Sequence, residues 1–106
     1  MAGGVVDVGA PQWGRLSKSV AGSADVTLSQ SEYENGIIEL TGAITGNIKI
    51  YLPLNDGRTW IVKNGTTGAF TVTFIGISGT GIVVATGKAA MIYTDGVNVN
   101  RISADV

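Results

Sequence analysis

Residues 58–75 read RTWIVKNGTTGAFTVTFI, and their pattern is the most informative about the fold. The second half of this stretch alternates Phe70, Val72 and Phe74 with threonines. Successive side chains of a strand point to opposite faces of a sheet, so this two-residue period predicts a half-buried strand. The pair Asn64-Gly65 interrupts the stretch, and Asn-Gly between apolar runs is a strong signal for a tight hairpin turn. The stretch therefore predicts two β-strands joined by a turn.

The same period recurs along the rest of the chain, for example where Ile48, Ile50 and Leu52 alternate with Lys49 and Tyr51. We expect seven or eight strands among nine windows: 17–21, 25–29, 36–42, 47–52, 58–63, 69–75, 81–85, 88–94 and 97–103. Further turn signals stand at Asn35-Gly36, Asp56-Gly57 and Asp95-Gly96. A helical period is missing from the sequence, apart from a single turn over 29–33, where Ser29 and Glu32 fit a capping box.

This pattern predicts an all-β protein, namely a single antiparallel β-sandwich or jelly-roll-like domain of about seven to eight short strands. The chain has 106 residues, which suits one domain. Residues 1–15 differ from the rest, with four glycines, a proline and Trp13 but only a brief apolar pair, Val5 and Val6. We therefore expect an extended N-terminal arm over 1–15 and a β-sandwich domain over 16–106.

Charged residues make up only 14% of the chain, whereas soluble domains usually contain about 25%. Two interpretations remain open: a surface rich in threonine, serine and asparagine, or a surface partly covered by a partner. The net charge of −1 comes from scattered side chains, so we expect neither nucleic acid nor an anionic membrane as a partner. The long uncharged stretch 64–87 is broken by glycines and indicates strands rather than a membrane span.

The sequence contains few residues of the kinds that catalysis or metal binding requires. The sequence has no cysteine and no histidine, which excludes a Ser–His nucleophile and a cysteine-ligated zinc site. Glu32 and Glu34 are candidates for paired carboxylates, but their polar surroundings favour a solvated turn. Ser17, Lys18 and Ser19 are adjacent, and neighbours on a strand point apart. We therefore expect a protein that is not an enzyme.

Two further patterns are candidate ligand sites. The segment 81–89 is similar to a phosphate-binding loop, but five residues rather than four separate its glycines, Ala89 stands where the motif needs Ser or Thr, and no helix pattern follows. Asn55, Asp56 and Asp95 at turn tips are candidate calcium ligands, although Asx turns explain them more simply. The sequence thus predicts no cofactor and no bound metal.

The aromatic residues divide into core and interface candidates. Trp60, Phe70 and Phe74 lie in register with apolar strand neighbours, which predicts that they belong to the core. Trp13 lacks such neighbours and, with Val5 and Val6, is the predicted interface of the arm, since tryptophan is enriched at interface hot spots. The alternative is that Trp13 folds back onto its own domain.

Residues 36–101 resemble a β-module of tailed-bacteriophage virion proteins, found in tail fibres, tail spikes and head-surface proteins. The resemblance rests on Gly36–Gly42, Ile48–Pro53, Arg58–Asn64, Thr67–Thr73, Gly87-Lys88 and Tyr93–Asn98. It implies a structural role in a virion and supplies no catalytic residues.

The short chain with an arm looks more like a capsid decoration (cement) protein than like a long fibre. Such a protein would bind the major capsid protein on the outer surface of the phage head and stabilise the shell, commonly as a homotrimer. The alternative is a receptor-binding component of the tail, a fibre or spike protein, in which an exposed Tyr33, Tyr51 or Tyr93 would contact host glycans. A small glycan-degrading enzyme is a third hypothesis, disfavoured by the absent histidine.

Overall fold

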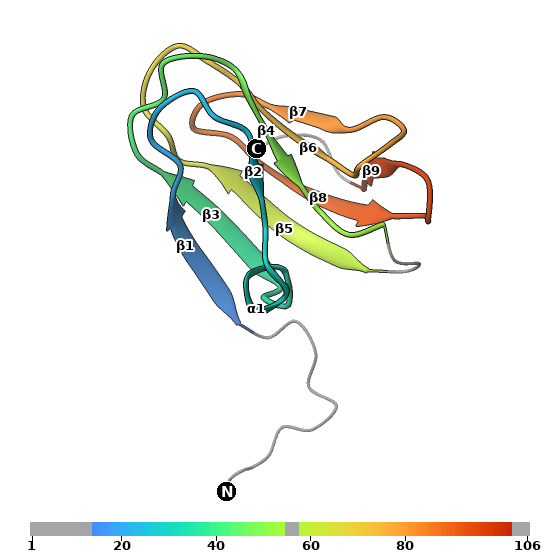
Figure 1. Cartoon of the computed structure of the whole chain (residues 1–106). Coiled ribbons are helices and arrows are strands. Elements are labelled where there is room, and N and C mark those ends of the chain that lie inside the picture. The colour runs from blue at the N-terminus through green and yellow to red at the C-terminus, as the bar shows by residue number, and fades with distance from the viewer. Residues whose placement is uncertain (1–13, 55–57, 103–106) are drawn as a thin grey trace, which may run out of the picture.

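The computed structural model describes residues 14–54 and 58–102 and shows an almost entirely β protein (Figure 1). The helical turn expected near Ser29 is present as α1 (Gln30–Tyr33), with its capping box formed. Within the described residues there are nine strands, more than the seven or eight expected, and each overlaps one of the nine expected windows: β1 (Arg15–Ser19), β2 (Val26–Thr27), β3 (Ile37–Thr41), β4 (Ile48–Tyr51), β5 (Thr59–Asn64), β6 (Val72–Ile75), β7 (Ile82–Val84), β8 (Ala89–Thr94) and β9 (Val99–Arg101). The all-β expectation is confirmed.

The chain alternates between two sheets as it advances. Sheet A has the order β1-β3-β5-β8-β9, and sheet C has the order β2-β4-β6-β7. In sheet A, β1, β3 and β5 run parallel, and in sheet C so do β2, β4 and β6. The first six strands therefore form three stacked coils, each of which gives one strand to each sheet, as in a β-solenoid.

The coils stack at an interval of 24 residues, except between the first two coils in sheet A, where Arg15 lies beside Ile37, 22 residues further on. Ile37 lies beside Ile61 in sheet A, and Ile48 lies beside Val72 in sheet C, so equivalent residues of the second and third coils are 24 apart. Side chains at the corners join the coils across the same interval. The Oδ1 atom of Asp25 accepts a hydrogen bond from the Lys49 backbone N–H at 2.9 Å, and Asn47 Oδ1 accepts one from the Thr71 backbone N–H at 2.9 Å.

After β6 the chain reverses and closes the stack. The pairs β6–β7, β5–β8 and β8–β9 are antiparallel. The Val99 backbone N–H donates to the Thr80 carbonyl at 3.0 Å, and an Arg101 guanidinium N–H donates to the Val83 carbonyl at 2.9 Å. These bonds tie β9 to the β7 side of sheet C, so the two sheets are joined at this end.

The expected antiparallel arrangement holds only for this closing part. Of the seven strand pairs within the described residues, four are parallel. The reason lies at Asn64-Gly65, which forms a corner between the sheets rather than a hairpin turn. Gly65 passes so close to the previous coil that a Cβ atom there would lie 2.7 Å from the Leu40 carbonyl oxygen. Asp95-Gly96 does form the expected hairpin, between β8 and β9, with Gly96 at a φ of 89°.

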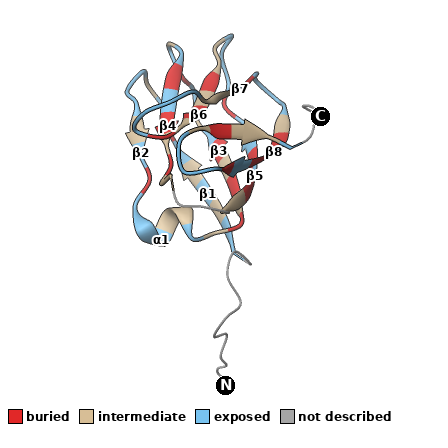
Figure 2. Ribbon diagram, turned by 90° about the vertical axis from the view of Figure 1, so that its right-hand side faces the viewer, coloured by how far each residue is buried: buried red, intermediate tan, exposed pale blue. Residues whose placement is uncertain are grey.

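The core lies between the two sheets, where the buried segments gather (Figure 2). Trp60 and Phe74 are buried in it as expected. Phe70 only packs against its margin and is partly buried, so its assignment to the core was too strong, because it precedes β6 rather than standing in it. The buried apolar side chains are Val20, Leu28, Ile38, Leu40, Ile44, Ile48, Ile50, Leu52, Trp60, Val62, Val72, Phe74, Val84, Ala90, Ile92 and Val99.

The strand at the open edge of sheet A is protected by a charge. Lys18 of β1 lies beside buried Leu40 of β3, so its side chain leaves the strand on the core side. Its ammonium group donates to the Glu32 carboxylate of α1 at 2.7 Å. An inward-pointing charge on an edge strand discourages a second chain from adding there. This edge is therefore a poor place for subunits to share a sheet.

Candidate functional site

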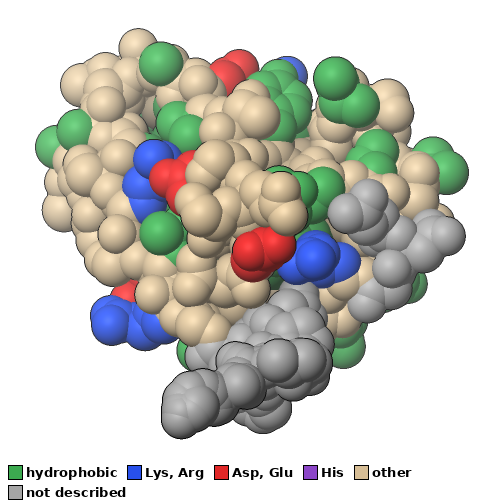
Figure 3. All heavy atoms as spheres, turned by 60° about the horizontal axis from the view of Figure 1, so that its bottom comes forward, with side chains coloured by type: hydrophobic (Ala, Val, Ile, Leu, Met, Phe, Trp, Pro, Cys, Tyr) green, Lys and Arg blue, Asp and Glu red, His purple; other side chains and the backbone are tan. Residues whose placement is uncertain are grey.

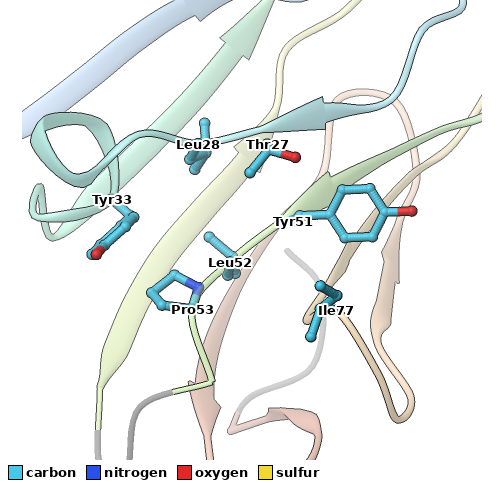
Figure 4. Close-up of a pocket in the computed structure, with 7 residues that line it drawn as sticks. All are labelled: Thr27, Leu28, Tyr33, Tyr51, Leu52, Pro53 and Ile77. Carbon is cyan, nitrogen blue, oxygen red and sulfur yellow. The ribbon is translucent and has the colours of Figure 1, made fainter.

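An apolar groove lies where the parallel strands of sheet C end. Leu28 follows β2, Leu52 and Pro53 follow β4, and Ile77 follows β6. The groove has a volume of about 480 Å³, within the range of about 300–1,000 Å³ typical of small-molecule sites. Its lining residues are Thr27, Leu28, Tyr33, Tyr51, Leu52, Pro53 and Ile77 (Figure 4).

Tyr33 is held at one end of the groove by its surroundings. It ends α1, and its carbonyl accepts a hydrogen bond from Trp60 Nε1 at 2.7 Å and a longer one from Arg58 at 3.4 Å. The Arg58 guanidinium also lies 5.4 Å from the centre of the Tyr33 ring, a distance at which a cation and a ring attract. Because Trp60 is buried, these contacts fix the helical turn to the core.

Tyr51 stands at the other end of the groove, on the outward face of β4. In the stack it lies between Thr27 of β2 and Ile75 of β6. Figure 4 shows Leu28, Leu52 and Pro53 between the two tyrosines, whose hydroxyl groups point away from each other. Ile77, which is 91% exposed, forms the rim beside Tyr51. The groove thus offers two aromatic rings and an aliphatic floor.

The groove is suited to binding by contact rather than to proton transfer. Its lining contributes the hydroxyl groups of Thr27, Tyr33 and Tyr51, and every other side chain there is apolar. Aromatic rings and aliphatic groups gain free energy by covering apolar ligand surface, while hydroxyls can orient a ligand by hydrogen bonds. A sugar ring, which has an apolar face and polar edges, matches this combination.

The structure separates the two carboxylates that the sequence placed on either side of Tyr33. Glu32 binds Lys18, whereas Glu34 accepts a hydrogen bond from the Gln30 side-chain amide at 2.9 Å. The Lys18 ammonium, followed by the Ser29 backbone N–H, lowers the pKa of Glu32 from its usual 4.5. A general acid needs a raised pKa, so this pair does not form the arrangement required for glycoside hydrolysis.

Asp95 stabilises a turn, as the Asx interpretation predicts. One of its carboxylate oxygens accepts hydrogen bonds from the Val97 and Asn98 backbone N–H groups, at 2.9 and 2.7 Å, and the other accepts one from the Asn100 side-chain amide at 2.9 Å. These donors lower the pKa of Asp95. Asn55 and Asp56, the other candidate calcium ligands, lie outside the described residues.

The structure also bears on several of the other site residues proposed from the sequence. Ser17 and Ser19 are exposed and Lys18 points the opposite way, so these neighbours do point apart. Strand β8 follows directly after Lys88, so no helix N-terminus stands behind the glycines of 81–89. Val5, Val6 and Trp13 lie outside the described residues. Over 14–54 and 58–102, no cluster of three acidic side chains capable of holding a metal ion occurs.

Comparison with known proteins does not assign the chain to a family. No protein-family model matches the chain, and neither a curated protein nor a solved structure matches it. In the part of the chain that the structure describes, no helix is both long and apolar enough to span a membrane. The fold and its surfaces therefore carry the functional argument.

Proposed function

We propose that this chain is a structural protein of a bacteriophage virion, a decoration protein that binds the outer surface of the head. The observation that supports the proposal most is the number of large apolar side chains left exposed on a sparsely charged surface. Within the described residues these are Ile61, Ile77, Val83, Met91, Tyr93, Val97 and Ile102. On the face shown in Figure 3, the few charged side chains lie largely as neighbours of opposite sign, among polar and apolar ones.

Four of the exposed apolar residues lie in strands of the two sheets. Ile61, Met91 and Tyr93 stand on sheet A, whereas Val83 stands on sheet C. Large apolar patches on a protein surface mark sites of interaction. A sheet face that carries several exposed apolar side chains, as sheet A does, is suited to packing against another subunit, as in the coat of a virion. This supports the structural role implied by the phage-like β-module.

The proposal is tested with phage particles that lack the chain. Their heads should lose DNA at a lower temperature than complete heads, and added purified protein should bind to them and restore the difference. Protein lacking residues 1–13, a deletion that leaves β1 intact, should stay folded yet bind the heads more weakly. If particles that lack the chain had heads of unchanged stability but no tail fibres, a role in head decoration would be contradicted.

The groove favours a second candidate function, recognition of host glycans by a tail fibre or spike. It brings together Tyr33 and Tyr51, two of the three tyrosines expected to contact glycans, and leaves Tyr93 on the other sheet. A glycan array with the wild type, Tyr51→Ala and Tyr93→Ala tests this role. Binding that is lost in Tyr51→Ala and kept in Tyr93→Ala would assign glycans to the groove, and an array without any binding would eliminate the role.

A further inference from the structure

The outer face of sheet A carries a row of apolar side chains that runs across the strands. Ile37 of β3 lies beside Ile61 of β5, and Ile61 lies beside Met91 of β8. The row continues to Ile102, whose backbone N–H donates to the Met91 carbonyl at 2.7 Å. Ile61, Met91 and Ile102 are exposed by 41%, 38% and 50%, and Ile37 is half-buried. We call these four residues the apolar row.

A second row, two residues further along the strands, carries charges. Glu39 of β3 lies directly beside Lys63 of β5, and it also accepts a hydrogen bond from Arg15 of β1 at 2.6 Å. Glu39 and Lys63 point to the same outer face as Ile37 and Ile61, because all four alternate with buried residues. Two neighbouring strands thus carry an apolar pair and, beside it, a pair of opposite charges.

This pattern is complementary to itself under a two-fold rotation. An axis that runs along the strands, midway between β3 and β5, places β3 of one copy over β5 of the other. Ile37 then faces Ile61 of the second copy, and Glu39 faces its Lys63. Isologous dimers need such a self-complementary patch, and packed sheets keep their strands within about 30° of each other. An axis along β3 itself would instead place Arg15 over Ile61 of the second copy, so that a charge would face an apolar side chain.

We propose that the outer face of sheet A binds a second copy of this chain, related by a two-fold axis between β3 and β5. The contact brings Ile37 of each copy against Ile61 of the other and forms two Glu39–Lys63 ion pairs between the copies. The inference depends on this face alone and is independent of where in a virion the chain lies. It differs from the homotrimer implied by the resemblance, in which three copies would meet around a three-fold axis.

The size of the face indicates a reversible contact. Around this axis β1, β3, β5 and β8 overlap with the second copy, and four strands about 4.8 Å apart, with about five residues each at a rise of about 3.3 Å, cover roughly 300 Å². A standard interface buries about 800 Å² on each partner, so this dimer should be weaker than a permanent one. We therefore expect an equilibrium between monomer and dimer that shifts with protein concentration.

Substitutions that reverse the charge of Glu39 or Lys63 test the proposed arrangement of the two copies. Glu39→Lys places two like-charged pairs at the interface, and Lys63→Glu does the same with the opposite sign. Each variant alone should dimerise at least about tenfold more weakly than the wild type in sedimentation velocity. Mixed one to one, the two variants should form a heterodimer. The lysine introduced in the first variant then faces the glutamate introduced in the second, and the unchanged Lys63 of the first faces the unchanged Glu39 of the second.

A substitution of an apolar residue and its matched control test the same interface without changing any charge. Ile61→Thr should weaken the dimer, whereas Val83→Thr, at an exposed strand position of sheet C, should leave it unchanged. Circular dichroism checks that each variant is folded. A wild type that stays monomeric up to its solubility limit, a trimer, or a dimer indifferent to these substitutions at 39 and 61 would overturn the proposal. So would a mixture of the two charge variants that remains monomeric.

Discussion

The side-chain amide of Asn64 donates a hydrogen bond of 2.9 Å to the backbone carbonyl of Val84 inside the core. Asn64 is fully buried, and its Oδ1 atom accepts hydrogen bonds from the backbone N–H of Thr66, at 3.1 Å, and from the Thr66 hydroxyl. One buried side chain therefore joins β5 of sheet A to β7 of sheet C and stabilises the corner where the chain leaves β5.

Asn64→Leu should destabilise the fold by about 3 kcal/mol, because the Val84 carbonyl and the Thr66 N–H lose buried partners that are each worth about 1–3 kcal/mol. Asn100→Ala, in an exposed hydrogen bond, should cost less than about 1 kcal/mol. Urea unfolding curves measure both. Equal losses for the two variants would show that the Asn64 bonds contribute no more than a surface contact.

Phe74 and Phe70 form a matched pair that tests the extent of the core. Phe74→Ala should cost about 3–5 kcal/mol, because Phe74 is fully buried between the sheets. Phe70→Ala should cost clearly less, since Phe70 is only partly buried. Thermal or denaturant melts of the two variants provide the comparison. A larger loss for Phe70→Ala would place the centre of the core elsewhere.

The Lys18–Glu32 pair should make stability depend on pH. The pKa of Glu32 is lowered in the folded chain, so the unfolded chain takes up the proton first as the pH falls. The stabilisation is therefore complete above the ordinary pKa of 4.5 and is lost as the pH falls through the lower, folded value. At neutral pH, Glu32→Gln should cost up to about 1 kcal/mol, as expected for a pair that is partly exposed.

The measurement for Glu32 is urea unfolding at neutral and at strongly acidic pH. The difference between the wild type and Glu32→Gln should shrink in acid, where both side chains are uncharged. Glu34→Gln serves as the control, since Glu34 bonds only to the exposed Gln30 side chain among the interactions described here. A difference between the wild type and Glu32→Gln that stays constant with pH would assign the effect to something other than the charge.

Substitutions of Gly68 and Gly87 distinguish the cost of backbone strain from the cost of a steric clash. Both have positive φ angles, 105° and 81°, which a residue with a Cβ adopts at a cost of about 1–2 kcal/mol. At Gly87 a Cβ would meet no atom within 4 Å, whereas at Gly68 it would lie 2.7 Å from the Ile44 carbonyl oxygen. Gly68→Ala should therefore lower the melting temperature more than Gly87→Ala. Similar shifts would show that the coils can separate to admit a methyl group.

The strands could be predicted from the sequence because each is a local two-residue pattern. Their direction could not, because it depends on which residues pair across the stack. Asn64-Gly65 has the local signature of a hairpin, and only its approach to Leu40 of the previous coil shows that it is a corner. A usable signal did exist. Ile48–Tyr51 and Val72–Ile75, 24 residues apart, share their apolar alternation, and such an interval is typical of stacked repeats.

The candidate site, like the fold, could be predicted from the sequence only in part. Tyr33 and Tyr51 could be proposed from the sequence as exposed aromatic residues, but Leu28, Pro53 and Ile77 could not be connected with them. These residues meet because β2, β4 and β6 end side by side, which follows from the parallel stack. The apolar row likewise appears only once Ile37, Ile61 and Met91 are known to be neighbours in sheet A.

We propose that the chain lies on the outer surface of a phage head, and a cryo-electron microscopy map of the virion that carries it tests this location directly. We expect density outside the head shell into which the two packed sheets fit, and loss of that density from particles lacking the chain. Density for the same two sheets in the tail, with a bare head surface, would contradict the proposal.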